Sequence, residues 1–241
     1  MAKDLSRRMK RIVLKLSGEA LKGQSESIFD EMILTQVGEK IKELVEKNIE
    51  VAIVVGGGNL WRGRNNSDMS QVTSDNLGMI STVVNALAVS DFIKIAGCKS
   101  EVLSSVPMPK FCEYFTAQRA DELLKSKTVV VFAGGTGNPY FSTDTTSALR
   151  AAEIKADVIL LGKMGVDAVY DSDPAKNPNA VRITSLTYKE IIEKDLKVMD
   201  ATAASLCMNT SVPIVVFGIE DLSNIDKILN GENIGTIIKE G

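Results

Sequence analysis

The stretch IVLKLSGEALKG, residues 12–23, places a lysine inside an apolar run that has the composition of a β-strand. On a two-residue period Leu14 and Leu16 share one face of this strand, and Lys15 shares the other face with Val13. Lysine is rarely buried unless its ammonium group meets an anion. Lys15 is therefore either an edge-strand side chain that reaches water or a group directed at a bound anion.

The composition excludes several classes of active site. The 241 residues include no histidine, so a Ser-His-Asp triad, a Cys-His pair and a histidine zinc site are all excluded. The 28 basic and 31 acidic residues leave a net charge of -3, which gives no general positive field for nucleic acid or an anionic membrane. Catalysis must therefore use carboxylates, lysine, arginine, backbone amides and a hard metal ion.

The cysteines and the N-terminal segment indicate a cytoplasmic protein. Cys98, Cys112 and Cys207 are odd in number and far apart, so neither a disulfide framework nor a thiolate metal site is expected. Lys15 interrupts the apolar run that follows the basic N-terminal residues, so we expect no signal peptide and no membrane-spanning segment.

Strand-like and helix-like segments alternate along the chain. We expect strands at 11–16, 50–55, 100–103, 128–133, 157–161, 212–217 and 234–238, and helices at 30–47, 76–96, 116–125, 144–155, 187–194, 201–209 and 223–230. This order predicts an α/β fold, a three-layer α/β/α sandwich around a mainly parallel sheet. No linker divides the chain, so we expect one domain, residues 1–241, with a cleft between two lobes. The stretch 170–180 is expected to be a loop.

Four of the expected strands end in glycine-rich or polar turns. The turns are Ser17-Gly18, Gly56 to Asn59, Gly134 to Pro139 and Gly162 to Gly165. Glycine lets a ligand approach the backbone amides, so such turns can cradle an anion, although a single one is usually only a turn. Because the carboxyl ends of parallel strands meet at one edge of a sheet, we expect the four together to form a phosphate-binding edge.

These turns do not match the common nucleotide-binding motifs. Gly162-Lys163 is followed by Met164, so the P-loop pattern is absent. Tyr140 stands where a dinucleotide fingerprint would have its third glycine. A P-loop enzyme and a Rossmann dehydrogenase are therefore not expected.

Three charged residues near these turns have two interpretations each. Asp144 and Asp200 each open an expected helix, and either could be only a helix cap. Arg62 follows the triple glycine, and it is either solvated or in contact with phosphate. Capping and phosphate binding are compatible, because a helix N-terminus also attracts anions.

Six segments together carry a resemblance to a known family. They are KLSGEAL (15–21), GGGNLWRG (56–63), DNLGM (75–79), AGGTGNPYFSTD (133–144), VDAVYDSDP (166–174) and LKVMDATA (196–203). They resemble the bacterial uridylate (UMP) kinases of the amino acid kinase superfamily, and the resemblance runs from about residue 10 to the C-terminus. It implies transfer of the ATP γ-phosphoryl group to the 5′-phosphate of UMP, with Mg²⁺ held mainly through the ATP phosphates.

The resemblance also implies a role for individual residues. Those implied to bind ATP are Lys15, Leu16, Ser17, Gly18, Gly58, Arg62, Lys163, Met164, Tyr170 and Asp173. Those implied to bind UMP are Gly57, Asp75, Thr136, Gly137, Asn138, Pro139, Tyr140, Phe141, Ser142 and Thr143. The implied catalytic residues are Lys15, Arg62, Asp144 and Asp200. Asp144 would orient Lys15 and the triphosphate, and Asp200 would hold the phosphate-binding lysine in place.

The family is typically homohexameric, activated by GTP and inhibited by UTP. Ser90 and Glu101 stand where some members carry basic effector-binding side chains, and Lys94 alone keeps its charge, so strong GTP activation is not expected. Met164 and Ala168 also depart from the family pattern beside the ATP base.

Two alternatives to a UMP kinase remain open at this point. The first is another kinase of the superfamily, acting on a carboxylate or an isoprenoid phosphate, which would carry an acceptor loop different from GTGNPYFSTD. The second is a nucleotide-binding storage or sensory protein without turnover. Such a protein would be expected to lose Lys15, Asp144 or Asp200, and all three are present.

Overall fold

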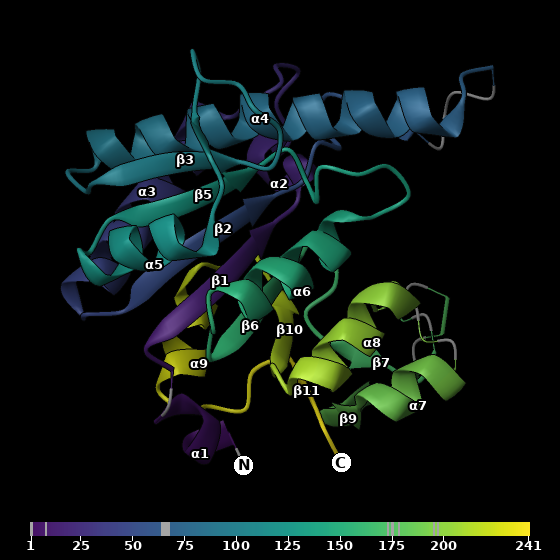
Figure 1. Cartoon of the computed structure of the whole chain (residues 1–241). Helices are drawn as coiled ribbons and strands as arrows, with labels where there is room; N and C mark the ends of the chain where they lie inside the picture. Colours follow the sequence, from purple (N-terminus) through teal and green to yellow (C-terminus); the bar gives the residue numbers. More distant parts are fainter. Residues whose placement is uncertain are drawn as a thin grey trace.

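The computed structural model describes residues 2–7, 9–63, 68–172, 174, 176–177, 179–194, 196 and 198–241. Within these ranges nine strands form one sheet in the order β4-β3-β5-β2-β1-β6-β10-β11-β9 (Figure 1). They are β1 (Arg11–Leu16), β2 (Glu50–Val55), β3 (Ser100–Ser104), β4 (Glu113–Tyr114), β5 (Val129–Ala133), β6 (Val158–Lys163), β9 (Ser185–Thr187), β10 (Ile214–Gly218) and β11 (Thr236–Lys239). Neighbours are parallel except that β11 runs antiparallel to β10. The mainly parallel sheet is confirmed.

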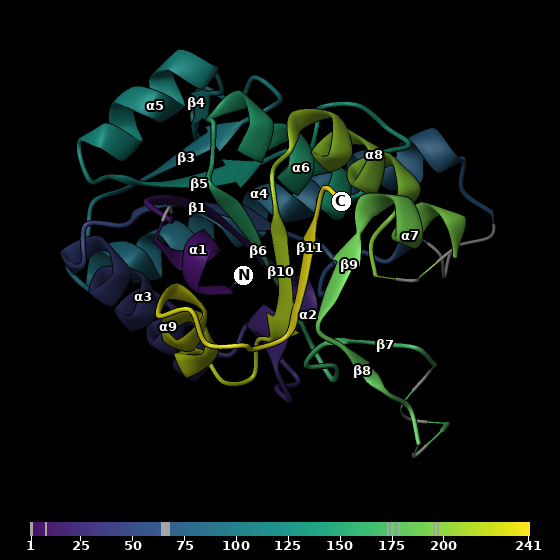
Figure 2. The same ribbon diagram turned by 90° about the horizontal axis from the view of Figure 1, so that it is seen from below.

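Helices cover both faces of this sheet (Figures 1 and 2). One face packs against α2 (Gly18–Lys22), α3 (Glu31–Glu46), α4 (Gln71–Ile95) and α9 (Ser223–Leu229). The other packs against α5 (Ala117–Lys125), α6 (Thr143–Glu153), α7 (Tyr188–Glu193) and α8 (Ala201–Thr210). The short α1 (Ala2–Ser6) packs beside α9. The structure therefore confirms the predicted three-layer α/β/α sandwich.

Strand β1 lies in the middle of the sheet, with β2 on one side and β6 on the other. Its side chains alternate as predicted: Leu14 and Leu16 join the core under α3 and α4, and Val13 joins the core under α6 and α8. Lys15 shares the Val13 face and is 8% exposed. The interpretation of Lys15 as an edge-strand lysine that reaches water is therefore wrong.

The predicted elements differ from the observed ones mainly where the elements are short. Strand β4, strand β9 and helix α2 were not expected, and the expected loop 170–180 begins inside the two-stranded pair β7 (Val169–Tyr170) and β8 (Arg182–Ile183). Elements of two to five residues carry too few side chains to show a hydrophobic period. Tertiary pairing decides whether such segments form.

Helix α4 is unusually apolar. Among the described helices it alone is long and apolar enough to cross a membrane by length and composition, and 44% of its most apolar window is buried inside the protein. A helix that packs into the core between other elements has the same composition. Here α4 packs against α3 on one side and against β3 and β5 on another.

The first prediction concerns Tyr188, which anchors α7 beneath α8. Tyr188 is 1% exposed, and its hydroxyl donates to the carbonyl of Val212 ahead of β10. Tyr188→Phe should lower the free energy of unfolding by about 1 to 3 kcal/mol, because the buried carbonyl loses its hydroxyl partner. Urea unfolding followed by circular dichroism measures this change.

Tyr114 provides the matched control because its side chain is 55% exposed. Tyr114→Phe should leave the free energy of unfolding within about 0.5 kcal/mol of the wild-type value. Equal effects of the two substitutions would show that the Tyr188 hydroxyl does not anchor α7.

Candidate active site

The four polar turns do meet at one edge of the sheet. Strands β5, β2, β1 and β6 are consecutive and parallel, so their carboxyl ends and the turns that follow lie side by side (Figure 1). Helix α2 begins at Gly18 within the first of these turns, and α6 begins at Thr143, shortly after the turn that follows β5. The polar backbone groups of four chain segments are thereby gathered around the end of β1.

Lys15 and Asp144 form an ion pair at this edge. The Lys15 Nζ lies 3.0 Å from Asp144 Oδ1, and the two side chains are 11% and 15% exposed. Asp144 stands in the first turn of α6, where Ser142 caps the helix by accepting from the amides of Asp144 and Thr145. The geometry brings together two residues that are 129 positions apart in the sequence.

A second lysine approaches the same carboxylate. Lys163, at the end of β6, has its Nζ 3.8 Å from Asp144 Oδ2. Burial lowers the pKa of Lys163; the charge of Asp144 opposes this lowering and the charge of Lys15 adds to it. Together the two ammonium groups carry more N–H donors than one carboxylate can accept from. The pair of lysines is therefore suited to binding a further anion.

Asp200 joins the starts of α6 and α8. Its carboxylate accepts hydrogen bonds from the hydroxyls of Ser142 and Thr145, the latter at 2.9 Å, and caps α8 through the amide of Ala203. These bonds fix the first turn of α6, which carries Asp144. The charge of Asp200 also opposes the lowering of the pKa of Lys163 by burial.

The turns after β1 and β2 pack directly against each other. A Cβ atom on Gly18 would lie 2.3 Å from Asn59 Oδ1 and 2.8 Å from the amide nitrogen of Gly58. A Cβ on Gly57 would lie 2.8 Å from the carbonyl oxygen of Gly78. Only glycine fits at these two positions, because a Cβ atom at either would collide with the neighbouring segment.

Asn85 supports the triple-glycine turn and was missed from the sequence. It lies in α4, is fully buried, and donates to the carbonyl of Gly56 at 2.6 Å and to Asn59 Oδ1 at 2.7 Å. Asn59 in turn donates to the carbonyl of Ile28. The available signal was a single asparagine within the apolar run VVNALAV of this helix, because a buried amide needs partners.

A cavity of about 210 Å³ opens beside the triple-glycine turn. Its lining includes Gly57, Gly58, Asp75, Phe141, Ser142 and Thr143 from the predicted site, together with Trp61, Gly63, Ser74, Gly78, Met79, Thr82, Gly135 and Thr146. Asp75 accepts hydrogen bonds at 2.7 Å from Gln71 and from the amide of Tyr140. Asp75 thereby connects α4 to the loop 134–142, which we call the acceptor loop.

The remaining predicted residues of the acceptor loop are partly outside this cavity. Thr136 and Asn138 form a local turn in which the Asn138 amide donates to Thr136 Oγ1 at 3.2 Å, and Gly137 and Pro139 lie in the same turn. Thr136, Asn138 and Phe141 line a neighbouring hollow between the acceptor loop, α6 and α8. The predicted run is therefore divided between two sides of one loop.

A second cavity, mainly apolar and about 480 Å³ in volume, is larger than the cavity beside the triple-glycine turn. The predicted residues Lys163, Met164 and Tyr170 line it, and so do Val166, Ala168, Val169, Asp171, Ser172, Pro174, Leu196, Val198 and Val216. Leu196 and Val198 come from a segment in which only Asp200 was expected. Asp173 was also predicted here and lies outside the described residues.

Arg62 and the turn after β1 complete the edge. Arg62 is about half exposed and forms an ion pair with Glu19 of α2. Leu16 is buried at the end of β1, and Ser17 caps α2 by accepting from the amide of Ala20. Arg62 therefore stands at the opening of the site and not in its interior.

Comparisons with known proteins agree with this geometry. Residues 10–218 match the amino acid kinase family. The structure is similar to a UMP kinase from Bacillus anthracis, with a TM-score of 0.93, 34% identity and 96% of each chain covered. It is also similar to a UMP kinase from Ureaplasma parvum, with a TM-score of 0.91, 38% identity, and 97% of this chain and 100% of that chain covered.

A more distant match is a uridylate kinase from Archaeoglobus fulgidus, with a TM-score of 0.71, 28% identity, and 94% of this chain and 99% of that chain covered. The family match spans most of the sequence and includes all four turns at the edge of the sheet. The chain therefore belongs to the amino acid kinase family.

Proposed function

We propose that this chain is a UMP kinase of pyrimidine biosynthesis that transfers the γ-phosphoryl group of ATP to the 5′-phosphate of UMP, giving ADP and UDP. The observation that carries the proposal is the position of the Lys15–Asp144 pair between two cavities. Asp144 lies within 3.8 Å of Lys163, which lines the larger cavity, and it follows Thr143, which lines the smaller. The likeness to UMP kinases over nearly the whole chain supports the choice of acceptor.

We assign ATP to the larger cavity. Its apolar lining suits a purine base, with Met164 and Tyr170 beside the base and ribose. Asp173 is assigned to the ribose from the resemblance alone. The triphosphate would then extend past Lys163 to the turns at the end of the sheet, where the assigned groups are Lys15, Leu16, Ser17, Gly18, Gly58 and Arg62.

We assign UMP to the smaller cavity. Asp75 would accept from the ribose hydroxyls, and Gly57 would bring its amide to the 5′-phosphate. The acceptor loop and Thr143 would close over the nucleoside; the residues assigned this role are Thr136, Gly137, Asn138, Pro139, Tyr140, Phe141, Ser142 and Thr143.

The chemistry proposed for this site needs no general base. The phosphate of UMP is already ionised near neutral pH, so catalysis reduces to positioning and charge neutralisation. Lys15 would neutralise the transferring phosphoryl group, and Asp144 would hold Lys15 in place. Asp200 would act indirectly, by fixing the helix turn that carries Asp144.

We propose that Mg²⁺ binds mainly through the ATP phosphates. In the described part of the chain no group of three or more Asp, Glu, Cys or His side chains gathers to hold a metal ion, so a cage made by the protein is not expected there. The single carboxylate of Asp144 beside the phosphate edge fits Mg²⁺, which usually takes substrate phosphates, water and few carboxylates. When bound with ATP, the ion would neutralise phosphate charge during transfer.

We further propose a cytoplasmic homohexamer of single-domain subunits, residues 1–241, that UTP inhibits. We expect GTP to activate only weakly. Ser90 is 2% exposed and pairs with the hydroxyl of Ser100 at 2.9 Å, so it faces the protein interior. Glu101 is exposed but acidic, which leaves Lys94 as the basic group of the three positions.

An ADP-release assay with Mg-ATP tests the proposed activity. We expect turnover with UMP and little with CMP, dCMP, glutamate, aspartate or isopentenyl phosphate, since the acceptor loop would select the uracil base and Asp75 would select a ribonucleotide. Preferred turnover of a carboxylate or of isopentenyl phosphate would assign the chain to another branch of the family. No turnover with any acceptor would favour a binding protein.

Replacing Lys15 tests the catalytic assignment. Lys15→Ala should lower kcat by about 100- to 1000-fold, because one preorganised donor to the developing charge is removed. Circular dichroism checks that the fold is intact. Lys125→Ala is the matched control, since that side chain is 66% exposed on α5 and should leave kcat unchanged. A Lys15→Ala protein with near-normal kcat would refute the assignment.

Replacing Asp75 tests the acceptor assignment. Asp75→Ala should raise the KM for UMP about tenfold or more and leave the KM for ATP nearly unchanged, because the ribose loses a charged acceptor. Asp91→Ala, at an exposed position of the same helix, is the control and should change neither value. Equal increases in both KM values for Asp75→Ala would contradict the assignment.

A further inference from the structure

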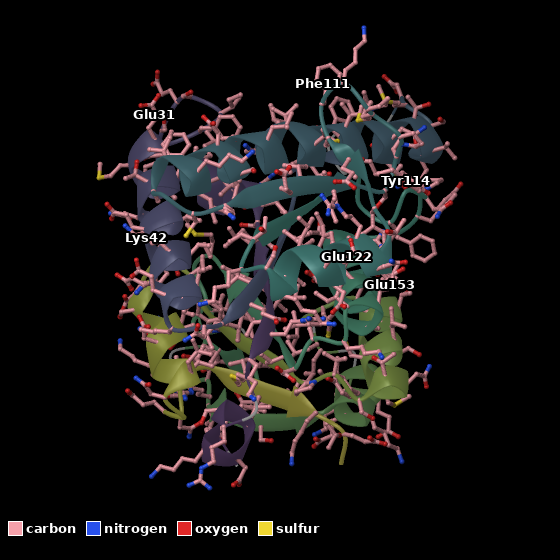
Figure 3. The ribbon with its side chains drawn as sticks, turned by 60° about the vertical axis from the view of Figure 1, so that its left-hand side comes forward. Glu31, Lys42, Phe111, Tyr114, Glu122 and Glu153 are labelled. Carbon is pink, nitrogen blue, oxygen red and sulfur yellow. The ribbon has the colours of Figure 1, made fainter. Side chains whose placement is uncertain are left out.

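Arg150 is a buried cation that the proposed mechanism does not use. It lies in α6, is 4% exposed, and points toward the segment that follows β3 and not toward the Lys15 edge. Its guanidinium forms an ion pair with Glu153 one turn along the helix and stacks over the ring of Phe115, with Cζ 3.9 Å from the ring centroid. Figure 3 shows Glu153 at the surface, on the side that carries Glu122 of α5. Arg150 is therefore held firmly from two directions.

The aromatic support of Arg150 is itself fixed. Phe115 packs edge-to-face on Phe132 of β5, with ring centroids 5.5 Å apart and an angle of 83° between the planes. The Nε of Arg150 is buried and has no hydrogen-bond partner among the described residues. A buried guanidinium with an unused donor carries a desolvation cost. A contribution to stability therefore does not by itself explain why an arginine occupies this position.

The third contact of Arg150 leads to the acceptor loop. Its Nη2 donates to Ser105 Oγ at 2.7 Å, and Ser105 Oγ donates to the carbonyl of Gly135 at 2.7 Å. Arginine can only donate, and a serine hydroxyl has a single proton. Because the guanidinium occupies the acceptor side of Ser105, it directs the hydroxyl proton onto Gly135.

The acceptor loop needs such a tether. Gly134, Gly135 and Gly137 have φ angles of +75°, +58° and +84°, a run that few other residues can adopt and that is flexible when it is unrestrained. Thr82 of α4 fixes the start of the loop by accepting from the Gly134 amide at 2.9 Å. Ser105, which follows β3, holds the next residue, and Gly135 itself lines the smaller cavity.

We propose that Arg150 and Ser105 are positioning residues that hold the acceptor loop in its UMP-binding form. Neither side chain lines the smaller cavity, so both act on the substrate through Gly135. The inference rests on the proposed function for the identity of the acceptor. The tether itself is a property of the free protein and can be measured without substrate.

Ser105→Ala is the central test. It should raise the KM for UMP about five- to tenfold, with kcat and the KM for ATP within about twofold of the wild-type values, because only the acceptor side loses a hydrogen bond. Hydrogen exchange of the free protein should become faster in residues 134–142. An unchanged KM for UMP together with unchanged exchange would overturn the proposal, and so would equal increases in both KM values.

Ser100→Ala is the matched control. Ser100 lies at the other end of β3, is 1% exposed, and loses a comparable hydrogen bond, to the Ser90 hydroxyl. It should lower the melting temperature without changing the KM for UMP or the exchange of residues 134–142. If Ser100→Ala raised the KM for UMP as much as Ser105→Ala, the effect would be one of general stability and the proposal would fail.

A double-mutant cycle separates the two positioning residues. Arg150→Met keeps an unbranched side chain but removes every N–H donor, and it should raise the KM for UMP by about the same factor as Ser105→Ala. The double variant should show no further increase, because Arg150 acts through Ser105. Additive effects would overturn this order of action. Wild-type protein that fails to phosphorylate UMP would refute the proposed function, whereas the exchange measurement would still decide whether the tether exists.

Discussion

The site depends on one buried ion pair, Lys15 with Asp144. A lysine at the centre of a parallel sheet is tolerable only where an anion lies at the end of its strand. Asp144 supplies one anion, but the ammonium of Lys163 shares it. A negatively charged ligand would thus complete the electrostatics of this edge. That requirement explains why the turns that gather around it are glycine-rich and offer amides.

The two cavities are formed by different parts of the chain. Chain segments before β6 form the smaller cavity, and segments from the end of β6 onward form most of the larger one. Helix α6 lines the smaller cavity through Thr143 and Thr146, and its first turn carries Asp144, which lies 3.8 Å from Lys163 in the wall of the larger cavity. Asp200 holds that turn from α8, through two hydroxyls. The walls of the two cavities are thereby linked by a single helix end.

Much of this arrangement was predictable from the sequence, because it rests on local patterns. The alternation of Val13, Leu14 and Lys15 indicated which face each side chain takes, and the apolar strands followed by glycine turns indicated that the turns gather at one edge of the sheet. The partners of those turns were not predictable. Asn85 contacts Gly56, and Ser105 contacts Gly135, because α4 and β3 pack beside those turns. The sequence around a polar residue does not indicate which distant residue it will contact.

Short elements could not be predicted from the sequence for a related reason. Strands β7, β8 and β9 have two or three residues each, and they exist because a neighbouring strand supplies their hydrogen bonds. The same holds for the direction of the Asp200 carboxylate, which accepts hydrogen bonds from Ser142 and Thr145. Side-chain direction at a helix start depends on the neighbouring helix, which the local sequence does not contain.

The contact between Asp75 and Tyr140 has a consequence for selectivity. Tyr140 has a φ of +71°, which is costly for a bulky residue, and the carboxylate that holds its amide is the one proposed to bind the sugar. Each oxygen of this carboxylate already accepts one internal hydrogen bond, from Gln71 or from the Tyr140 amide, and each can accept a further one from a ribose hydroxyl. The group that sets the conformation of the acceptor loop would therefore also distinguish a ligand with both ribose hydroxyls from a ligand with one.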